Sequence, residues 1–181
     1  MANEVNIDVT VRNFNDEAAS FIDRLFPNGF TGDSNSMELT NPVFDTDFTN
    51  ETWQRDWAED NIDSKWITGM LISKSETKIW FTLTSAWQPP FGWIEKLTER
   101  LIELAPDVSL ACQIQDEGFE FCGAAYFSKL YSNIEWLGDV DGDLFWSDDE
   151  YRDKFYEEIN TMLETYREYH TVLLTSELKN D

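Results

Sequence analysis

The stretch that decides the fold runs from Trp66 to Ile94 and reads WITGMLISKSETKIWFTLTSAWQPPFGWI. Its two apolar segments, 66–73 and 78–87, are rich in the β-branched and aromatic residues that favour strands, and a short polar turn separates them. Pro89 and Pro90 then preset the backbone for the start of a helix. The stretch therefore predicts a β-hairpin that leads directly into a helix.

The residues after this stretch continue the same alternation of helix and hairpin. A helix is expected over 90–105, with an apolar stripe made of Trp93, Ile94, Leu97, Leu101, Ile102 and Leu104. Two strands, 107–115 and 119–127, are expected to pair around an acidic turn that contains Gly118. Gly118 can supply the positive φ of a tight hairpin, and Gly123 allows a close backbone approach or a bulge.

The residues before the stretch begin with a strand and a helix. Apolar and polar residues alternate over 4–12, which is typical of a half-buried strand. Asn15 can cap a helix over 15–26. Residues 30–60 are rich in Asn, Asp, Thr and Ser, and predict a loop-rich acidic insertion with a short strand near 37–40 and a short helix over 52–60.

The chain ends in a long amphipathic helix that is predicted from Asp148 to about His170. Its apolar positions follow the helical repeat and are Tyr151, Phe155, Ile159, Met162, Tyr166 and Tyr169. The order of elements predicts an α+β protein: a ferredoxin-like β-α-β-β-α-β antiparallel sheet with helices on one face and an added C-terminal amphipathic helix. A length of 181 residues predicts a single domain over 1–181, with 131–181 as an acidic loop and C-terminal helix.

The charge of the chain is strongly negative and unevenly spread. Thirty-six Asp and Glu residues face 13 Lys and Arg, which gives a formal net charge of −23. Residues 61–130 carry a net charge of only −3, whereas 1–60 and 131–181 carry −10 each. Because aromatic residues make up 15% of the chain, we expect a folded domain rather than a disordered acidic tail. Such a field repels nucleic acid and anionic membranes, and it attracts basic protein surfaces.

Several classes of protein do not fit this sequence. No run of about 18 apolar residues occurs, so no membrane span is expected. The first residues lack a basic segment followed by an apolar one, so no signal peptide is expected and the predicted location is the cytoplasm. Cys112 and Cys122 are predicted to be reduced core thiols. The low isoelectric point, near 4, argues against direct binding of nucleic acid.

Three short motifs in the balanced middle of the chain resemble one known family. They are NIDSKW over 61–66, TSAWQPP over 84–90 and DEGFEFCG over 116–123. In this order they resemble the signatures of the YubB-type ferredoxin-like domain of unknown function, which phages and conjugative plasmids carry. Ile62 and Asp63 stand where the family has Trp and Gly. The resemblance covers about a third of the chain, and makes 61–127 a family-like core.

The resemblance implies a ferredoxin-like fold and an origin in a mobile element, and it implies no activity. Within the motifs, Trp87 is expected to be buried under the helix that follows the two prolines. Lys65 is the one motif residue with the chemistry to bind a ligand, and its simpler interpretation is a local ion pair. If the protein comes from a phage, its location is the cytoplasm of the host.

The sequence offers little that indicates catalysis. His170 is the sole histidine, and its place near the end of the last helix favours a cation that stabilises the helix dipole. No phosphate-binding loop, dinucleotide-binding glycine pattern or nucleophile elbow is present. We therefore predict a protein that is not an enzyme and has no cofactor. A carboxylate pair of the glycosidase kind stays open as an alternative, because so many acids will place some pairs close together by chance.

One acidic segment, 139–150, has part of the spacing of a calcium loop. Asp139, Asp141, Asp143 and Glu150 occupy the first, third, fifth and twelfth positions. Leu144 stands at the sixth position, where the sharp turn of a calcium loop requires glycine. These four residues are therefore a weak metal candidate, and the main expectation is no metal site.

The last helix carries the candidate partner-binding residues. Acidic side chains fall largely away from its apolar stripe, at Asp149, Asp153, Glu157, Glu164 and Glu168. Carboxylates spaced along a rigid helix can imitate the phosphates that dominate the affinity of nucleic-acid-binding proteins. The plainer interpretation is a solvated helix face.

Three hypotheses for function follow from these observations. In the first, the chain is an acidic non-enzymatic protein of a phage or plasmid, and it inhibits a host nucleic-acid-binding defence protein by nucleic-acid mimicry. In the second, it is a generic interaction or assembly module that binds through exposed aromatic residues, and its acid serves only solubility. In the third, it is an enzyme with a carboxylate site. The first hypothesis predicts a continuous acidic ridge, and the second predicts an exposed apolar patch.

Overall fold

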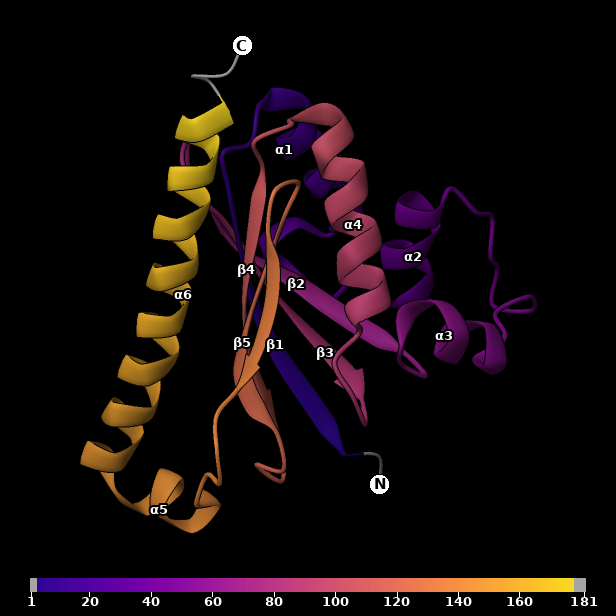
Figure 1. Ribbon diagram of the computed structural model, residues 1–181. Coiled ribbons are helices and arrows are strands. Elements are labelled where there is room, and N and C mark those ends of the chain that lie inside the picture. Colours follow the sequence, from indigo (N-terminus) through magenta and orange to yellow (C-terminus); the bar gives the residue numbers. More distant parts are fainter. Residues whose placement is uncertain (1–2, 178–181) are drawn as a thin grey trace.

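The structure is a computed structural model that describes residues 3–177, and its centre is one antiparallel sheet (Figure 1). The sheet has six strands in the order β2-β3-β1-β4-β5-β6. Their bounds are β1 Glu4–Arg12, β2 Ile67–Lys74, β3 Ile79–Ala86, β4 Ser109–Asp116, β5 Cys122–Ser128 and β6 Ser132–Trp136. Each of the five neighbouring pairs is antiparallel. The five strands predicted from sequence periodicity are therefore confirmed.

The edge strand β6 was not predicted. It follows β5 after a short turn and pairs with it, so that Gly123 lies opposite Trp136. A Cβ atom at Gly123 would lie 2.3 Å from the carbonyl oxygen of Glu135, which confirms that this glycine allows a close backbone approach. Because β5 and β6 extend the sheet beyond β4, the strand order is not that of the classic ferredoxin sheet.

Six α-helices and one short 3₁₀ turn are described. They are α1 Asp16–Leu25, the 3₁₀ turn Gly29–Thr31, α2 Ser36–Phe44, α3 Arg55–Ile62, α4 Phe91–Leu104, α5 Gly142–Ser147 and α6 Asp149–Glu177. The protein is thus of the α+β class, with a long C-terminal helix. No helix among residues 3–177 is long and apolar enough to cross a membrane.

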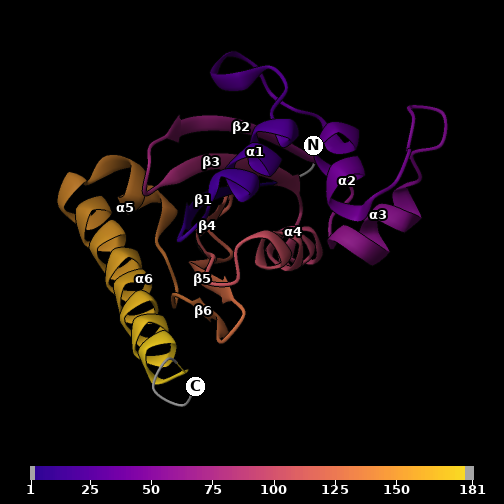
Figure 2. The same cartoon turned by 90° about the horizontal axis from the view of Figure 1, so that it is seen from above.

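The helices divide between the two faces of the sheet. α1 and α4 pack on the same face, as predicted, and their buried residues share a core with the inward side chains of β1, β3 and β4. α6 packs on the opposite face, over β5 and the edge of β4. Viewed from above, α4 and α6 lie on opposite sides of these strands (Figure 2). The main core is therefore separated by the sheet from a second, smaller core beneath α6.

The segment predicted to be a loop-rich insertion is more ordered than expected. Instead of the short strand expected near 37–40, the chain forms α2. The reason is a capping box: the side chain of Asn35 accepts hydrogen bonds from the backbone of Glu38, whose carboxylate accepts one from the backbone of Asn35. α3 begins at Arg55, three residues later than the predicted start of that helix.

The β4–β5 turn differs in one detail from the prediction. Phe119, not Gly118, has a positive φ, of 57°. The carboxylate of Asp116 holds the turn by accepting hydrogen bonds from the backbone N–H groups of Gly118 and Phe121. This backbone directs Phe119 toward the second core, where its ring lies 4.8 Å from that of Phe145. The positive φ of Phe119, which is uncommon for a bulky residue, thus goes together with the packing of its ring in the second core.

The two cysteines are free and buried, as predicted. Cys112 belongs to the core beneath α1 and α4, whereas Cys122 belongs to the core beneath α6. Burial raises the pKa of both thiols, that of Cys122 to about 11. Because their side chains lie on opposite faces of the sheet, the two residues cannot form a disulfide with each other.

Candidate functional site

The acidic helix α6 is held to the sheet by one buried stripe. The stripe consists of Phe155, Ile159, Leu163, Tyr166 and His170. Tyr169, which the sequence placed in the stripe, is instead 51% exposed, and its ring packs on that of Tyr131 at 4.9 Å. The buried positions continue from Tyr166 to His170, and position 169 lies about 100° around the helix from position 170, at the side of the stripe.

His170 is part of this buried stripe and does not act as the exposed helix-end cation that the sequence predicted. Its Nδ1 atom lies 2.9 Å from the hydroxyl of Tyr126 on β5. Burial lowers the pKa of His170 below its usual value, so the imidazole is neutral near pH 7. The residue fastens the last turns of α6 to the sheet.

The five predicted partner-binding carboxylates all lie on the exposed side of α6. Asp149, Asp153, Glu157, Glu164 and Glu168 are each exposed, as expected for positions off the buried stripe. We call this set the acidic ridge. At about 1.5 Å of rise per residue it spans about 28 Å. Because the opposite side of the helix is buried, the spacing of these carboxylates along the axis is fixed.

Ion pairs within the helix partly neutralise the negative charge of two carboxylates of the ridge. Arg152 pairs with Asp149, and Arg167 pairs with Glu164. Lys154 pairs with Glu150 beside the ridge. Asp153, Glu157 and Glu168 form no ion pair with any Lys or Arg of the described chain. These three residues are therefore the part of the ridge that is open to an external cation.

The charge density of the ridge can be compared with that of DNA. Five carboxylates over about 28 Å leave four intervals of about 7 Å on average, whereas one DNA strand carries a phosphate every 3.4 Å or so along its axis. The ridge therefore has about half the linear charge density of a single strand. A basic groove that binds several phosphates would meet fewer, more widely spaced charges.

The weak metal candidate at 139–150 does not form a calcium loop. Residues 142–147 form α5 instead, and the carboxylate of Asp141 caps this helix by accepting a hydrogen bond from Leu144. Glu150 pairs with Lys154 on the next helix. Within residues 3–177 no three His, Cys, Asp or Glu side chains come together as metal ligands would.

A cleft lined by aromatic side chains lies where the three motif segments meet. Its volume is about 480 Å³, and its lining residues are Asp63, Trp87, Gln88, Pro89, Phe91, Phe121 and Trp136. Asp63 of the first motif is tied to the start of α4, just beyond the second motif, because its carboxylate accepts a hydrogen bond of 2.6 Å from the backbone of Gly92. The ring of Trp136 lies 5.9 Å from that of Phe121 and 6.1 Å from that of Phe91. We call this feature the aromatic cleft.

The position of Trp87 contradicts the prediction that it is buried. Trp87 is 47% exposed and has a φ of 70°. Its backbone N–H donates to the carbonyl of Asn3 just after β3 ends, and the left-handed conformation there turns the indole away from the core. Trp93 on α4 is buried, as predicted, and its indole N–H donates to the carbonyl of Leu39.

Two cations approach the exposed indole of Trp87. The ammonium of Lys65 and the guanidinium of Arg55 each lie 5.4 Å from the centre of its ring. For Lys65 this cation–π contact replaces the local ion pair that the sequence suggested. Such contacts contribute about 0.5–1 kcal/mol at exposed sites. They hold the indole at the rim of the aromatic cleft.

Comparisons with known proteins leave the chain without an assigned family. No protein-family model matches the chain, no curated protein matches its sequence, and no solved structure matches its fold. The resemblance to YubB-type domains therefore stays a hypothesis that rests on the three motifs. What the structure adds is that residues from all three motifs line or border one cleft.

Sequence reasoning found the acidic ridge and missed the aromatic cleft. The ridge lies on one helix, so the 3.6-residue repeat is enough to place it. The cleft draws Trp136 from the edge strand β6, which the sequence did not predict. A usable signal was the short apolar-polar alternation over 132–136, with Ile134 and Trp136 on one side.

Proposed function

We propose that this chain is an acidic, non-enzymatic protein-binding domain that uses its acidic ridge to engage the basic surface of a host protein that binds nucleic acid. The observation that carries the proposal is the rigid presentation of the five carboxylates on the outer side of a 29-residue helix. Their electrostatic attraction steers a basic surface toward the helix.

The rest of the molecule supports a role in protein binding. Asp153, Glu157 and Glu168 keep their charges available, since no basic residue of the described chain pairs with them. The net charge of −23 opposes direct binding of nucleic acid. A ligand that occupies the basic groove of a partner would compete with the partner's own nucleic acid, which is how mimicry inhibits.

We further propose an origin in a phage or plasmid and a ferredoxin-like unit within the larger sheet. The three motifs support the origin through their resemblance to YubB-type domains. The unit would comprise β1-α1-β2-β3-α4-β4, whose strands are adjacent in the order β2-β3-β1-β4 and whose two helices share one face. On this interpretation, β5, β6 and α6 are additions that carry the functional surface. The cytoplasm of the host is the proposed location.

The test compares two triple variants with the same change in charge. The first reverses the open part of the ridge: Asp153→Lys, Glu157→Lys and Glu168→Lys. The control reverses three exposed acids away from α6: Glu51→Lys, Glu76→Lys and Glu120→Lys. Partners are captured from host extract at low salt, and the affinity of each purified partner is measured for the wild type and both variants.

We expect the ridge variant to lose binding and the control variant to retain most of it. Wild-type binding should weaken steeply with salt, because exposed charges are screened beyond about 10 Å at 0.1 M ionic strength. The protein should also displace DNA or RNA from the partner competitively. Equal losses in both variants would mean that only net charge matters, and unchanged binding in the ridge variant would refute the proposal.

A second candidate function rests on the aromatic cleft. Trp87 and Trp136 are each close to half exposed at its rim, and exposed aromatic residues are enriched at protein interfaces. In this case the protein is an interaction or assembly module whose acid serves solubility. Partner binding would then be insensitive to salt and lost in Trp136→Ala, while the ridge variant would bind normally.

A further inference from the structure

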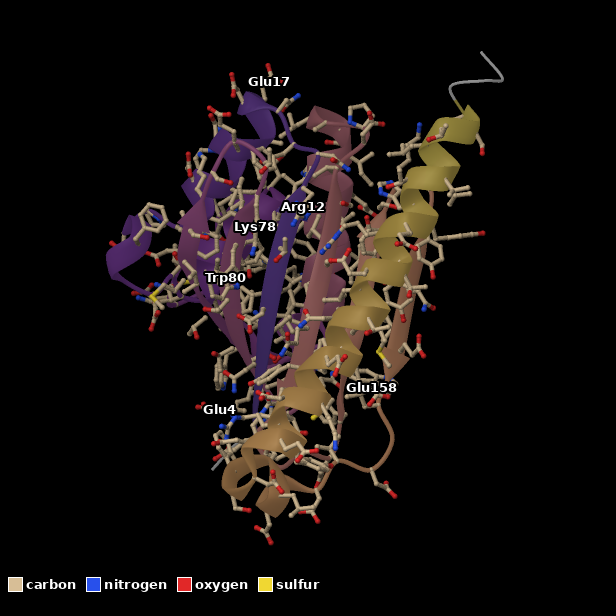
Figure 3. The ribbon with its side chains drawn as sticks, turned by 90° about the vertical axis from the view of Figure 1, so that its left-hand side faces the viewer. Glu4, Arg12, Glu17, Lys78, Trp80 and Glu158 are labelled. Atoms are coloured by element: carbon tan, nitrogen blue, oxygen red, sulfur yellow. The ribbon has the colours of Figure 1, made fainter. Side chains whose placement is uncertain are left out.

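A second, polar cleft lies between α6 and the part of the sheet that α6 leaves uncovered. Its volume is about 320 Å³. Its lining comes from β1, β3, β4 and α6 and comprises Asp8, Thr10, Arg12, Lys78, Trp80, Ala111, Gln113, Asn160, Leu163, Glu164 and Arg167. Figure 3 shows Arg12, Lys78 and Trp80 on this open part of the sheet, beside the helix.

Three cations converge on this cleft in a chain that has few cations. Val11 on β1 pairs with Ile79 on β3. Arg12 follows Val11 on β1 and Lys78 directly precedes Ile79, so the two residues lie side by side at the same end of the cleft. Arg167 reaches the cleft from α6. Outside the cleft, most of the described basic residues pair with a nearby carboxylate.

Two guanidinium nitrogens at this site lack hydrogen-bond partners. The Nε atoms of Arg12 and Arg167 are buried and have no hydrogen-bond partner. Neither Arg12 nor Lys78 forms an ion pair within the described chain. Lys78 instead lies over the ring of Trp80, 5.4 Å from its centre. A buried donor without a partner costs about 1–3 kcal/mol, so such groups call for an explanation such as a bound ion.

The two carboxylates of the cleft do not fill this role. Glu164 pairs with Arg167 through a different nitrogen, Nη1. Asp8 accepts a hydrogen bond of 3.2 Å from the indole N–H of Trp80. Burial raises the pKa of Asp8, while the hydrogen bond from Trp80 and the nearby ammonium of Lys78 act in the opposite direction. Asp8 is thus a counter-charge for Lys78 and Glu164 one for Arg167, and Arg12 is the cation of the cleft that has neither an ion pair nor a partner for its Nε atom.

We propose that this cleft binds a small phosphate monoester. The lining carries three cations against two carboxylates, so an anion is favoured there, and a phosphate monoester presents three strong acceptor oxygens to the three cations, whereas a carboxylate presents two. The phosphate oxygens can also accept hydrogen bonds from the buried Nε atoms, and guanidinium groups suit phosphate in both charge and shape. The site borders the acidic ridge, since Glu164 belongs to both, but the proposal does not depend on the function proposed for the ridge.

The remainder of the cleft suits the organic part of such a ligand. Its volume lies within the range of small-molecule sites, and a phosphate group fills only part of it. Trp80 supplies an apolar wall for a planar or cyclic group. Thr10, Gln113 and Asn160 supply side chains that donate and accept hydrogen bonds. This combination fits a nucleoside monophosphate or a phosphorylated sugar.

The test uses calorimetry on the full-length protein with four probes: adenosine monophosphate, ribose 5-phosphate, inorganic phosphate and adenosine. The variants are Arg12→Gln and Lys78→Gln, and neither residue belongs to the acidic ridge. The matched control is Lys129→Gln, which removes a charge from an exposed lysine in the β5–β6 turn. Thermal unfolding of each variant is recorded alongside.

We expect the phosphorylated probes to bind and adenosine not to bind. Arg12→Gln and Lys78→Gln should each weaken binding about tenfold or more, because a hydrogen bond to a charged group contributes about 1.5–3 kcal/mol. Lys129→Gln should change the affinity less than twofold. If adenosine monophosphate binds much more tightly than ribose 5-phosphate, the base occupies the wall formed by Trp80.

A nuclear magnetic resonance titration of the wild type keeps the test decisive if Arg12→Gln does not fold. The indole N–H signal of Trp80, identified by its loss in Trp80→Phe, should shift with adenosine monophosphate. The proposal is overturned if no phosphorylated probe shifts this signal, or if Lys129→Gln weakens binding as much as Lys78→Gln. Binding of a single-stranded oligonucleotide in place of every small probe would also overturn it.

Discussion

The two tryptophans that flank the Pro89-Pro90 turn should respond very differently to truncation. Trp93 is fully buried, and its indole N–H donates a 3.1 Å hydrogen bond to the carbonyl of Leu39. Trp87 is 47% exposed at the rim of the aromatic cleft. The perturbation is therefore a pair of variants, Trp93→Ala and Trp87→Ala, measured against the wild type.

The loss in the free energy of unfolding expected for Trp93→Ala follows from the burial of the side chain and from its hydrogen bond. A buried tryptophan side chain covers about 200 Å², which corresponds to about 5 kcal/mol at 25 cal/mol per Å². Truncations of this kind usually cost about 3–5 kcal/mol, and the loss of the hydrogen bond to the carbonyl of Leu39 adds about 1 kcal/mol. We therefore expect a loss of about 4–6 kcal/mol, a large part of the stability of a typical domain.

The loss in the free energy of unfolding expected for Trp87→Ala is much smaller. About half of the side chain already contacts solvent, and its cation–π contacts with Lys65 and Arg55 contribute about 0.5–1 kcal/mol each at exposed sites. We expect a loss of about 1–2 kcal/mol. Trp87→Gly should be at least as stable as Trp87→Ala, because glycine adopts a φ of 70° without strain.

The assay is unfolding in guanidinium chloride followed by far-ultraviolet circular dichroism, which does not depend on the number of tryptophans. Trp93→Phe is the control: it keeps a large apolar ring and loses the hydrogen bond, so about 1–3 kcal/mol is expected. If Trp87→Ala costs as much as Trp93→Ala, Trp87 belongs to the core and the aromatic cleft does not exist as described.

Two further predictions concern protonation and calcium. Because burial lowers the pKa of His170 below 6.5, the neutral imidazole favours folding; this contribution is complete above pH 6.5 and is lost as the pH falls below it. The resonance of the single histidine should titrate with a midpoint below pH 6.5. A midpoint above that value would contradict the burial of His170 beside Tyr126. Millimolar calcium should leave the fluorescence of Trp146 nearly unchanged, because helix α5 keeps the carboxylates of 139–150 apart. A saturable change that disappears in Asp139→Ala and Glu150→Ala would refute this.

The sequence was a good guide wherever a single element decides the outcome. Strand 4–12 was predicted to the residue, because alternation over nine positions leaves one register that buries the valines. The exposure of the acidic ridge followed in the same way from the helical repeat. Element type and the facing of side chains are local properties, so periodicity is sufficient to predict them.

The predictions failed where a helix cap or a single backbone conformation, and not the composition of the segment, decides the structure. The polar residues around 37–40 led to the prediction of a loop with a short strand. The capping box at the start of this segment makes it a helix instead. Trp93 is buried, as the helical repeat predicted, whereas the left-handed backbone of Trp87 turns its side chain out of the core. No pattern in the sequence indicated the exposure of Trp87.

The sequence alone determined the alternation of strands and helices, the negative field and the outward ridge of α6. These depend on residue type and on regular repeats. Only the tertiary structure decided that α6 packs on the face opposite to α4, that Arg12 and Lys78 meet Arg167, and that β6 closes the aromatic cleft. The physical reason is that clefts form between elements distant in the chain, where packing in three dimensions chooses the neighbours.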